Sequence, residues 1–241
     1  MRTKRLLIVD NSLHPILFRP WRSWKRFVGN VPYDVVNVPS GRPVPPLERY
    51  THLLLTGSEA SIVAPKPWFD LEATLIRDAA DAGLPILASC FGHQMLAYAL
   101  SGPATVRRTP SPEVGWVTLH VTRRDELFVD APDEWPAFAY HFDEVFDLPE
   151  PWHVLAHTDR CAVQIMRFGD RPIWGIQAHP EMSHKKAQAV TRIYLLLRGK
   201  AARRVITALR RPSLDEGPIR TVVRRFLTTD PTNPPVDSAG R

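Results

Sequence analysis

Short apolar runs alternate with helical patterns in the first hundred residues of the chain. Each run is aliphatic and bounded by turn-forming residues, which is typical of buried strands. The predicted strands are residues 5–10, 35–38, 52–56 and 84–88. Apolar side chains recur at helical spacing in 68–82 and 91–100. Because strands alternate with helices, we expect a mostly parallel sheet covered by helices.

The later apolar runs are closer together and have the character of hairpins. They cover residues 116–121, 137–142, 153–157 and 162–168. Hairpin-like runs favour antiparallel pairing, since antiparallel strands need only short connections. We therefore predict an α/β fold, a flavodoxin-like three-layer sandwich whose mostly parallel central sheet carries an added antiparallel portion.

Composition sets the size of the core and locates the charge. The chain has 241 residues, of which 44% are hydrophobic, and this is enough for one substantial core. The formal net charge of +6 comes from the C-terminal part, because residues 183–226 hold twelve Lys or Arg against Asp215 and Glu216. A solvated basic face is the ordinary explanation. Docking of an acidic partner is the sharper one, and we rank it above nucleic acid because no aromatic-basic motif accompanies the charge.

The same patterns divide the chain into three parts. Residues 1–183 form the predicted main domain, and residues 184–227 form basic helices packed on it. The apolar positions that suggest amphipathic helices are Leu195, Leu196, Val205, Ile206 and Leu209. Residues 228–241 are polar and rich in Pro, so we expect disorder there.

Several classes of protein and site are disfavoured. No apolar stretch is long enough to span a membrane, and the first apolar run is too short for a signal peptide. The two Cys residues lie far apart, which predicts a reducing cytoplasm and no disulfide. The nine His residues come without Cys pairs or an HExxH pattern, so we predict neither a metal site nor a cofactor.

The strongest chemical signal is Cys90, in the sequence PILASCFGHQMLAYAL. A predicted strand ends just before it and a helical pattern begins at Phe91, so Cys90 lies at a strand-to-helix turn. Ala88 and Gly92 flank it two residues away on either side and leave room for the backbone. Such a turn exposes a nucleophile, and the positive end of the helix favours a thiolate. A buried structural Cys is the alternative, because a lone Cys carries no partner information.

A partner for this thiol occurs much later, in PIWGIQAHPEMS. Residues 172–178 form a further predicted core strand, which delivers His179 and Glu181 at its end. A thiol nucleophile needs an imidazole as base and acid, and that imidazole needs a third group to orient it. His179 and Glu181 fit these two roles. Taken alone, His-Pro-Glu would be read as a surface loop with a solvated Glu.

These separated motifs resemble the class I glutamine amidotransferases, and more narrowly the free-standing relatives of the glutaminase domain of GMP synthase. The resemblance covers residues 6–183 and makes the main domain an amidotransferase-like catalytic domain. It implies that Cys90 attacks the side-chain amide of glutamine, that ammonia leaves a γ-glutamyl thioester, and that water then releases glutamate. By the same resemblance, His179 is the acid and base and Glu181 orients it.

Family members stabilise the oxyanion with backbone donors. Phe91, directly after the nucleophile, supplies one N–H through the geometry of the turn. The second is expected from Gly57 and Ser58, after the strand at 52–56. Relatives usually carry two glycines there, and Ser58 would adopt the required conformation at a strain cost of about 1–3 kcal/mol. Relatives also carry Gly at the position of Ala88, which is small enough for the turn to survive. An ordinary strand-ending turn is the alternative for Gly57 and Ser58.

Two motifs resemble parts of the family that contact the substrate. Gln94 lies on the same helix face as Cys90, and the equivalent Gln in relatives contacts bound glutamine. A solvated helix Gln is the alternative. Gly115 and Trp116, in EVGW, match a loop that approaches the glutamine pocket. They also fit a hairpin strand in which Trp116 packs in the core.

Three further features are less specific. His141 and Asp143, in AYHFD, match a family segment near the site, where they read the ligand or hold the pocket loop. We favour the supporting role. Gln164 also matches a family position, but no chemistry can be assigned to it. Segment 11–30 holds two Trp residues among Arg and Lys, which fits either a lid over the site or an amphipathic packing helix.

Three functions stay open at this point. The first is hydrolysis of glutamine, with ammonia passed to a separate synthetase as partner protein. The second is a γ-glutamyl peptidase or hydrolase acting on a γ-glutamylated small metabolite, which requires an open pocket for a larger leaving group. The third is a non-catalytic binding relative, suggested by Ser58 and Ala88. The joint presence of Cys90, His179 and Glu181 argues against this third function.

Overall fold

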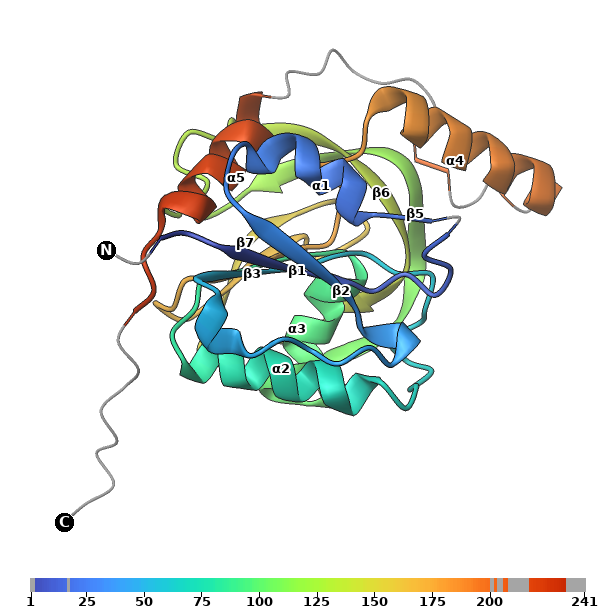
Figure 1. Ribbon diagram of the computed structural model, residues 1–241. Coiled ribbons are helices and arrows are strands. Elements are labelled where there is room, and N and C mark those ends of the chain that lie inside the picture. Colours follow the sequence, from blue (N-terminus) through green and yellow to red (C-terminus); the bar gives the residue numbers. More distant parts are fainter. Residues whose placement is uncertain (1–2, 17, 200–201, 203–205, 208–216, 233–241) are drawn as a thin grey trace.

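The fold is built on one mixed sheet, shown in the computed structural model of Figure 1. The structure describes residues 3–16, 18–199, 202, 206–207 and 217–232. These residues form a nine-stranded sheet in the order β2-β1-β3-β4-β9-β8-β7-β5-β6.

Five strands of the sheet run parallel to one another. They are β1 (Leu6–Asp10), β2 (Tyr33–Asn37), β3 (His52–Leu55), β4 (Ile86–Ser89) and β9 (Ile173–Ile176). The inner strands β1, β3, β4 and β9 are buried along their whole length, as expected for a parallel sheet covered on both faces. Because the strands are parallel, the ends of β3, β4 and β9 lie at the same edge, where Ser89 pairs with Ile176.

The other four strands continue the sheet in antiparallel pairing. They are β8 (Ile165–Phe168), β7 (Trp152–His157), β5 (Val106–Val121) and β6 (Glu134–Val145). Strands β5 and β6 form a long hairpin whose register shifts between Arg108 and Glu113. The predicted α/β fold, with a parallel sheet and an added antiparallel portion, is confirmed.

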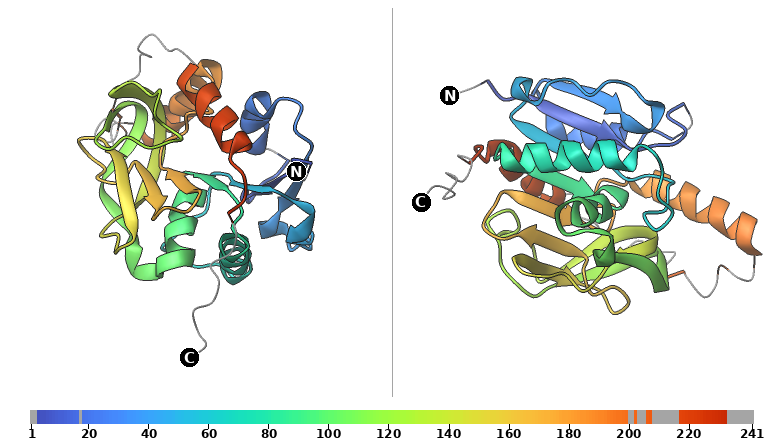
Figure 2. Two further views of the ribbon diagram at one scale, coloured as in Figure 1. Left: turned by 90° about the vertical axis from the view of Figure 1, so that its left-hand side faces the viewer. Right: turned by 90° about the horizontal axis from the view of Figure 1, so that it is seen from below.

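Helices cover both faces of the parallel half (Figures 1 and 2). On one face lie α2 (Phe69–Asp81) and α3 (Phe91–Ser101), whose core residues include Phe69 and Met95. On the other lie α1 (Trp21–Val28) and α5 (Gly217–Thr228), which contribute Trp24 and Phe226 to a second core. Helix α4 (His184–Arg198) extends at the periphery. Short 3₁₀ helices among the described residues include η1 (Val38–Ser40), η2 (Leu47–Arg49) and η3 (Pro103–Thr105).

The C-terminal part packs on the domain in two places, one around the end of α4 and the other along α5. Leu195 and Ile206 are partly buried against a small cluster that includes Val114, whereas Leu196 is 84% exposed. Val205 and Leu209, also predicted to be apolar helix positions, lie outside the described residues. Helix α5 ends at Thr228.

Disorder was predicted from residue 228 onward, but residues 228–232 are described by the structure. Thr228 is the last residue of α5, and residues 229–232 follow it. The backbone N–H of Thr232 donates to the carbonyl of Gly83 at 2.9 Å, which ties this segment to the turn after α2. The remainder of the predicted tail, 233–241, lies outside the described residues. Among the helices that the structure describes, none has both the length and the apolar character needed to cross a membrane.

A buried acid joins α2 to the end of β1. Glu72 is fully buried, and its Oε1 accepts a hydrogen bond from Nδ2 of Asn11 at 2.8 Å. The same amide nitrogen also donates to the carbonyl of Thr56 at the end of β3. Burial raises the pKa of Glu72 to about 8, although the hydrogen bond from Asn11 lowers it. Near neutral pH the buried carboxyl group therefore holds its proton.

We expect Glu72→Gln to stabilise the protein increasingly as the pH rises. The pKa of Glu72 is raised in the folded state, so its contribution to stability is complete below the unfolded value of 4.5 and is lost as the pH rises through about 8. Glutamine does not titrate, so the variant does not lose this stability as the pH rises. The free energy of unfolding in urea should favour the variant by about 1–3 kcal/mol more at pH 8.5 than at pH 5.

Asp78→Asn, at an exposed position of the same helix, is the matched control and should show no such trend. A difference between Glu72→Gln and the unmodified protein that stays constant over this pH range would contradict a buried, protonated Glu72.

Candidate active site

The backbone turns sharply at Cys90, between β4 and α3. Its φ of 49° and ψ of −110° are values that residues with a Cβ rarely adopt. Two hydrogen bonds that the turn donates to the neighbouring strands hold it in place. The N–H of Cys90 donates to Ile176 at 2.8 Å, and the N–H of Gly92 donates to Thr56 at 3.1 Å. The strand-to-helix turn predicted from the sequence is therefore present, with strain stored at the Cys residue.

Close packing explains the small residues around the turn. A Cβ at Gly92 would lie 2.7 Å from Cβ of Leu55 and 2.8 Å from the carbonyl oxygen of Leu55, too close for any side chain. Ala88 is completely buried in β4 and pairs with Gly175 on β9. Its methyl group is accommodated beside that glycine, so the turn forms without a glycine at position 88.

His179 follows β9 and is held from two sides. Its backbone N–H donates to the carbonyl of Phe138 at 2.7 Å, and its Nδ1 lies 3.0 Å from Oε1 of Glu181. Both side chains are buried, with residue exposures of 6% for His179 and 1% for Glu181. The carbonyl of Glu181 accepts a hydrogen bond from Nη2 of Arg26 at 3.0 Å. Helix α1 therefore helps to fix the loop that carries the imidazole and the carboxylate.

The thiol and the imidazole meet at Gly57. A methyl group on this glycine would lie 2.9 Å from Cε1 of His179 and 3.6 Å from Cβ of Cys90. Burial lowers the pKa of His179, but the charges and hydrogen bonds of Cys90 and Glu181 raise it by more, so the pKa lies well above its ordinary value. This environment favours the protonated form of the His179 imidazole.

The predicted backbone donors lie around the same point. Phe91 is the first residue of α3, so no carbonyl of its own helix can accept its N–H. Gly57 and Ser58 directly follow Thr56, whose carbonyl binds Gly92. Oγ of Ser58 accepts a hydrogen bond from the N–H of Ala60 at 3.0 Å, which braces the turn. Both oxyanion donors stay predictions.

Gln94 is buried rather than solvated, with 3% of the residue exposed. Its Nε2 donates to the carbonyl of Asp143 at 2.8 Å and to Oε1 of Gln177 at 3.1 Å. The amide hydrogens of Gln94 are therefore used within the protein. Its contact with the substrate stays a prediction.

Gly115 and Trp116 lie in β5, opposite β6. Trp116 is 5% exposed, packs edge-on against Phe138 at 5.6 Å between ring centroids, and stacks on the ring of His184. Gly115 has a φ of 124°, which favours glycine at that point of the strand. Trp116 therefore packs in the core, which is one of the two positions that the sequence allowed for it.

His141 and Asp143 belong to a buried polar network behind the turn. His141 binds Glu113 through Nε2 at 2.9 Å, and its Nδ1 lies 3.1 Å from the carbonyl oxygen of Asp143. The carboxylate of Asp143 accepts hydrogen bonds from Oγ of Ser61 at 2.6 Å and from the N–H of Ile62 at 3.1 Å. This arrangement ties β6 to the loop that begins at Gly57.

Sequence reasoning missed the centre of this network, Glu113. Its Oε1 accepts from Thr158 at 2.8 Å, and its Oε2 accepts from Nε2 of Gln164 at 2.7 Å. Gln164, to which no chemistry could be assigned, therefore helps to satisfy a buried carboxylate. Glu113 is the first residue of the EVGW motif, but only Gly115 and Trp116 of that motif were given a role from the sequence.

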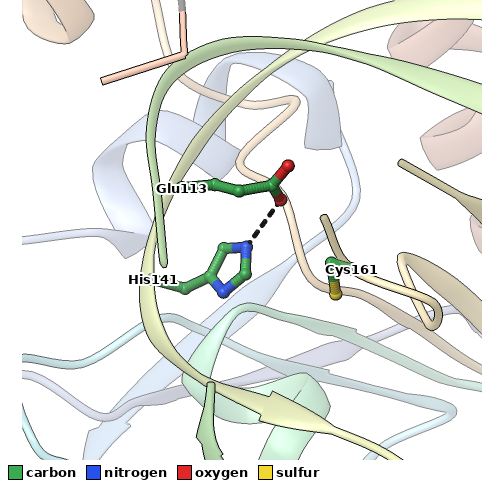
Figure 3. Close-up of side chains that lie close together, drawn as sticks. All are labelled: Glu113, His141 and Cys161. Carbon is green, nitrogen blue, oxygen red and sulfur yellow. Dashed lines mark hydrogen bonds and ion pairs between the residues drawn. The ribbon is translucent and has the colours of Figure 1, made fainter. Parts of the chain in front are cut away.

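Figure 3 shows that Glu113, His141 and Cys161 lie together, with the imidazole pointing at the carboxylate. One ligand atom from each falls within 4.8 Å of the others, which is compact enough for a metal ion. It is the one such group among the residues that the structure describes, and the sequence had predicted no metal site. A metal would have to displace the hydrogen bonds that Glu113 already accepts from Gln164 and Thr158.

This second cluster also contains a Cys, a His and a Glu, but its geometry does not suit nucleophilic catalysis. Both ring nitrogens of His141 are engaged, one by Glu113 and the other by the backbone, so neither faces the thiol as a base. Burial raises the pKa of the Cys161 thiol far above its ordinary value, and the charge of Glu113 raises it further. Cys161 is 1% exposed and its Sγ donates to the carbonyl of Val163.

A pocket of about 430 Å³ adjoins the His179 pair. Its wall combines the segment before and within α1 with one face of α4. The lining residues that matter for its chemistry are Arg19, Arg22, His179, Glu181 and Lys186. Segment 11–30 thus supplies both the buried helix face, through Trp24, and a rim beside the candidate site.

Comparison with known proteins agrees with this fold and identifies the family. The model of the family "Glutamine amidotransferase class-I" matches residues 30–193, and the chain belongs to this family. A glutamine-hydrolysing GMP synthase subunit of Methanocaldococcus jannaschii is 42% identical over 106 residues, which are 44% of this chain and 55% of the relative. The corresponding subunit of Methanococcus aeolicus is 31% identical over 147 residues, which are 61% of this chain and 74% of the relative. For several of these relatives, the matched part is about half of their length.

Solved structures share the fold at lower identity. A glutamine amidotransferase of Thermotoga maritima superposes with a TM-score of 0.77 at 23% identity, covering 95% of this chain and all of the other. One from Methylobacillus flagellatus gives a TM-score of 0.71 at 22% identity, covering 94% of this chain and 92% of the other. The family resemblance inferred from the motifs is confirmed.

We expect Cys90→Gly to be more stable than Cys90→Ala. Both variants lack the thiol, but alanine keeps the Cβ that makes the observed φ unfavourable, whereas glycine does not. Urea unfolding should give a free energy of unfolding about 1–2 kcal/mol higher for the glycine variant.

The same pair of substitutions at Cys161, where no positive φ occurs, is the control. There alanine should be at least as stable as glycine, because glycine gains more entropy on unfolding. Equal stability of the two Cys90 variants would contradict strain at this turn.

Proposed function

We propose that the chain hydrolyses the γ-amide of glutamine through a covalent γ-glutamyl thioester on Cys90. The observation that carries the proposal is the convergence of the strained Cys90 and the His179–Glu181 pair at Gly57. Membership of the amidotransferase family supports it. The names of the relatives, which describe glutamine-hydrolysing proteins, point to the same substrate.

In the first half of the reaction, the Cys90 thiolate attacks the γ-carbonyl carbon of glutamine. The raised pKa of His179 supports a thiolate–imidazolium pair as the resting state. As the tetrahedral intermediate collapses, the C–N bond breaks and the imidazolium gives its proton to the leaving nitrogen. Ammonia departs and the thioester remains.

In the second half, neutral His179 takes a proton from water, whose oxygen attacks the thioester carbonyl. The C–S bond breaks, glutamate leaves, and Cys90 and His179 return to their starting state. Glu181 holds Nδ1 of His179 throughout, which keeps Nε2 directed at the reacting atoms. The N–H of Phe91 and a donor from the Gly57–Ser58 turn stabilise the oxyanion in both halves.

The ammonia is passed to a separate synthetase in this proposal. The relatives named as individual subunits of a GMP synthase support such a division of labour. Basic residues on α4 and α5 offer a face for an acidic surface of that partner, and charge of this kind mainly accelerates and orients association.

A second candidate function is hydrolysis of a γ-glutamyl amide with a leaving group larger than ammonia. The pocket beside His179 is the observation that favours it, because the leaving nitrogen must approach this imidazole. The chemistry at Cys90 is the same for both candidates.

We expect His179→Ala to lower kcat for glutamine hydrolysis at least about 10³-fold, since base and acid are lost together. Glu181→Gln should cost less, about 10–100-fold, because glutamine can still bind the ring but carries no charge. Release of ammonia and glutamate, followed in parallel by coupled assays, measures both effects.

His157→Gln, on β7 and away from the turn, is the matched control and should keep the unmodified kcat. Retention of full hydrolysis by His179→Ala would remove His179 from the proposed mechanism, whatever the effect at Glu181.

A further inference from the structure

Thr56 contacts both of the loops that carry the predicted oxyanion donors. Its carbonyl accepts a hydrogen bond from the N–H of Gly92, the residue after Phe91, at 3.1 Å. Its hydroxyl donates to the carbonyl of the next residue, Gly57, also at 3.1 Å. Thr56 directly follows β3 and is completely buried, so water does not compete for these bonds. One residue therefore holds the two loops at a fixed separation.

Asn11, at the end of β1, binds both polar groups of Thr56. The N–H of Asn11 donates to the hydroxyl oxygen of Thr56 at 3.1 Å, and its Nδ2 donates to the carbonyl of Thr56 at 3.2 Å. A threonine hydroxyl has one hydrogen to donate. Because the N–H of Asn11 approaches this hydroxyl as a donor, the hydroxyl hydrogen is left for the carbonyl of Gly57. The direction of the bond from Thr56 to Gly57 is therefore fixed.

This bond also sets the direction of the peptide between Gly57 and Ser58. The peptide is trans, so its C=O and N–H point in opposite directions. The carbonyl of Gly57 faces the hydroxyl of Thr56, which is bound on the side of β1. Strand β3 lies between β1 and β4 in the sheet. The N–H of Ser58 therefore points toward the side of β3 on which Cys90 follows β4.

The N–H of Ser58 is free to bind a ligand. Among the residues that the structure describes, none accepts a hydrogen bond from it. The neighbouring Cα of Gly57 faces the nucleophile, since a Cβ there would lie 3.6 Å from Cβ of Cys90. The φ of Ser58 is not positive, so the turn accommodates a residue with a side chain. The turn thus presents an unpaired donor beside the thiol.

We propose that Thr56 is a positioning residue for the reaction at Cys90. Its hydroxyl holds the carbonyl of Gly57 and thereby directs the N–H of Ser58 at the oxyanion of the tetrahedral intermediate. The inference rests on the proposed thioester chemistry and identifies the group that orients the oxyanion turn. A donor directed at developing charge stabilises the transition state more than the bound substrate. The effect of Thr56 therefore belongs to kcat rather than to KM.

Thr56→Val tests this role, because valine keeps the shape of the side chain and removes the hydroxyl. We expect kcat for glutamine hydrolysis to fall about 10–100-fold with little change in KM, since a misdirected donor costs less than a deleted one. Thr56→Ser keeps the hydroxyl and should restore kcat to near the unmodified value. Release of ammonia and glutamate measures these effects. An unchanged kcat in Thr56→Val would overturn the proposal.

Alkylation of Cys90 by iodoacetamide separates this role from a general disturbance of the turn. The thiolate displaces iodide from a saturated carbon, and no oxyanion forms in this step. The alkylation rate, followed by intact mass with peptide mapping to locate the adduct, should be the same in Thr56→Val and the unmodified protein. If the alkylation rate falls as far as kcat, Thr56 only supports the thiol, and the positioning role is wrong.

Thr105→Val is the matched control. Thr105 lies in η3, beyond the C-terminal end of α3, and is 3% exposed. Its hydroxyl also donates to a backbone carbonyl, that of Gly102, at 2.8 Å. This variant should unfold at a lower urea concentration than the unmodified protein but keep its kcat. An equal fall of kcat in Thr105→Val and Thr56→Val would assign the effect to lost stability and contradict the proposal.

Ser58→Pro removes the N–H itself and gives a second test that does not depend on the folding of Thr56→Val. Proline has no N–H, and its fixed negative φ agrees in sign with the φ of Ser58. We expect kcat to fall at least as far as in Thr56→Val, with alkylation of Cys90 unchanged. Full hydrolysis by Ser58→Pro would exclude this N–H as the donor and refute the positioning role alone. Failure of the unmodified protein to hydrolyse glutamine would instead refute the proposed function.

Discussion

The structure depends on one backbone constraint, the positive φ of Cys90. Hydrogen bonds from Cys90 to β9 and from Gly92 to the end of β3 hold this conformation. They form only because β3, β4 and β9 are parallel and end at the same edge of the sheet. For a residue with a Cβ, such a φ value costs about 1–3 kcal/mol. The surrounding sheet must supply that energy. The geometry of the thiol therefore depends on the packing of the parallel strands.

A buried polar network supports the loops on either side of this turn. Glu113 and His141 form its centre, and Asp143 connects it to the loop after Gly57. Gln94 extends it from α3, one turn after the nucleophile. Buried polar groups are costly unless they are all paired, and this network pairs most of its members. Cys161 lies beside it as a neutral, inaccessible thiol. Two clusters of the same three residue types therefore differ in geometry: both ring nitrogens of His141 are engaged, whereas Glu181 engages one ring nitrogen of His179.

Much of the fold could be predicted because its signals are local. The parallel strands are short, aliphatic and bounded by turn residues, and all five were predicted within about two residues of their observed ends. The strand-to-helix turn at Cys90 and the loop carrying His179 and Glu181 could be predicted because each comes directly after one of these strands. The length of β5 could not be predicted, since its first half is polar and pairs with β6 across a register shift. The polar network could not be predicted from the sequence, for a related reason. Its members come from β5, β6 and the segments around β8, and only the pairing of distant strands brings them together.

The most direct test of the central claim is covalent trapping of the nucleophile. The purified protein is treated with 6-diazo-5-oxo-norleucine, a glutamine-like electrophile, and its intact mass is measured alongside Cys90→Ser and Cys161→Ser. The proposed mechanism predicts one adduct in the unmodified protein and in Cys161→Ser, and none in Cys90→Ser. An adduct that persists in Cys90→Ser, or the absence of an adduct from all three proteins, would contradict a working γ-glutamyl site at Cys90.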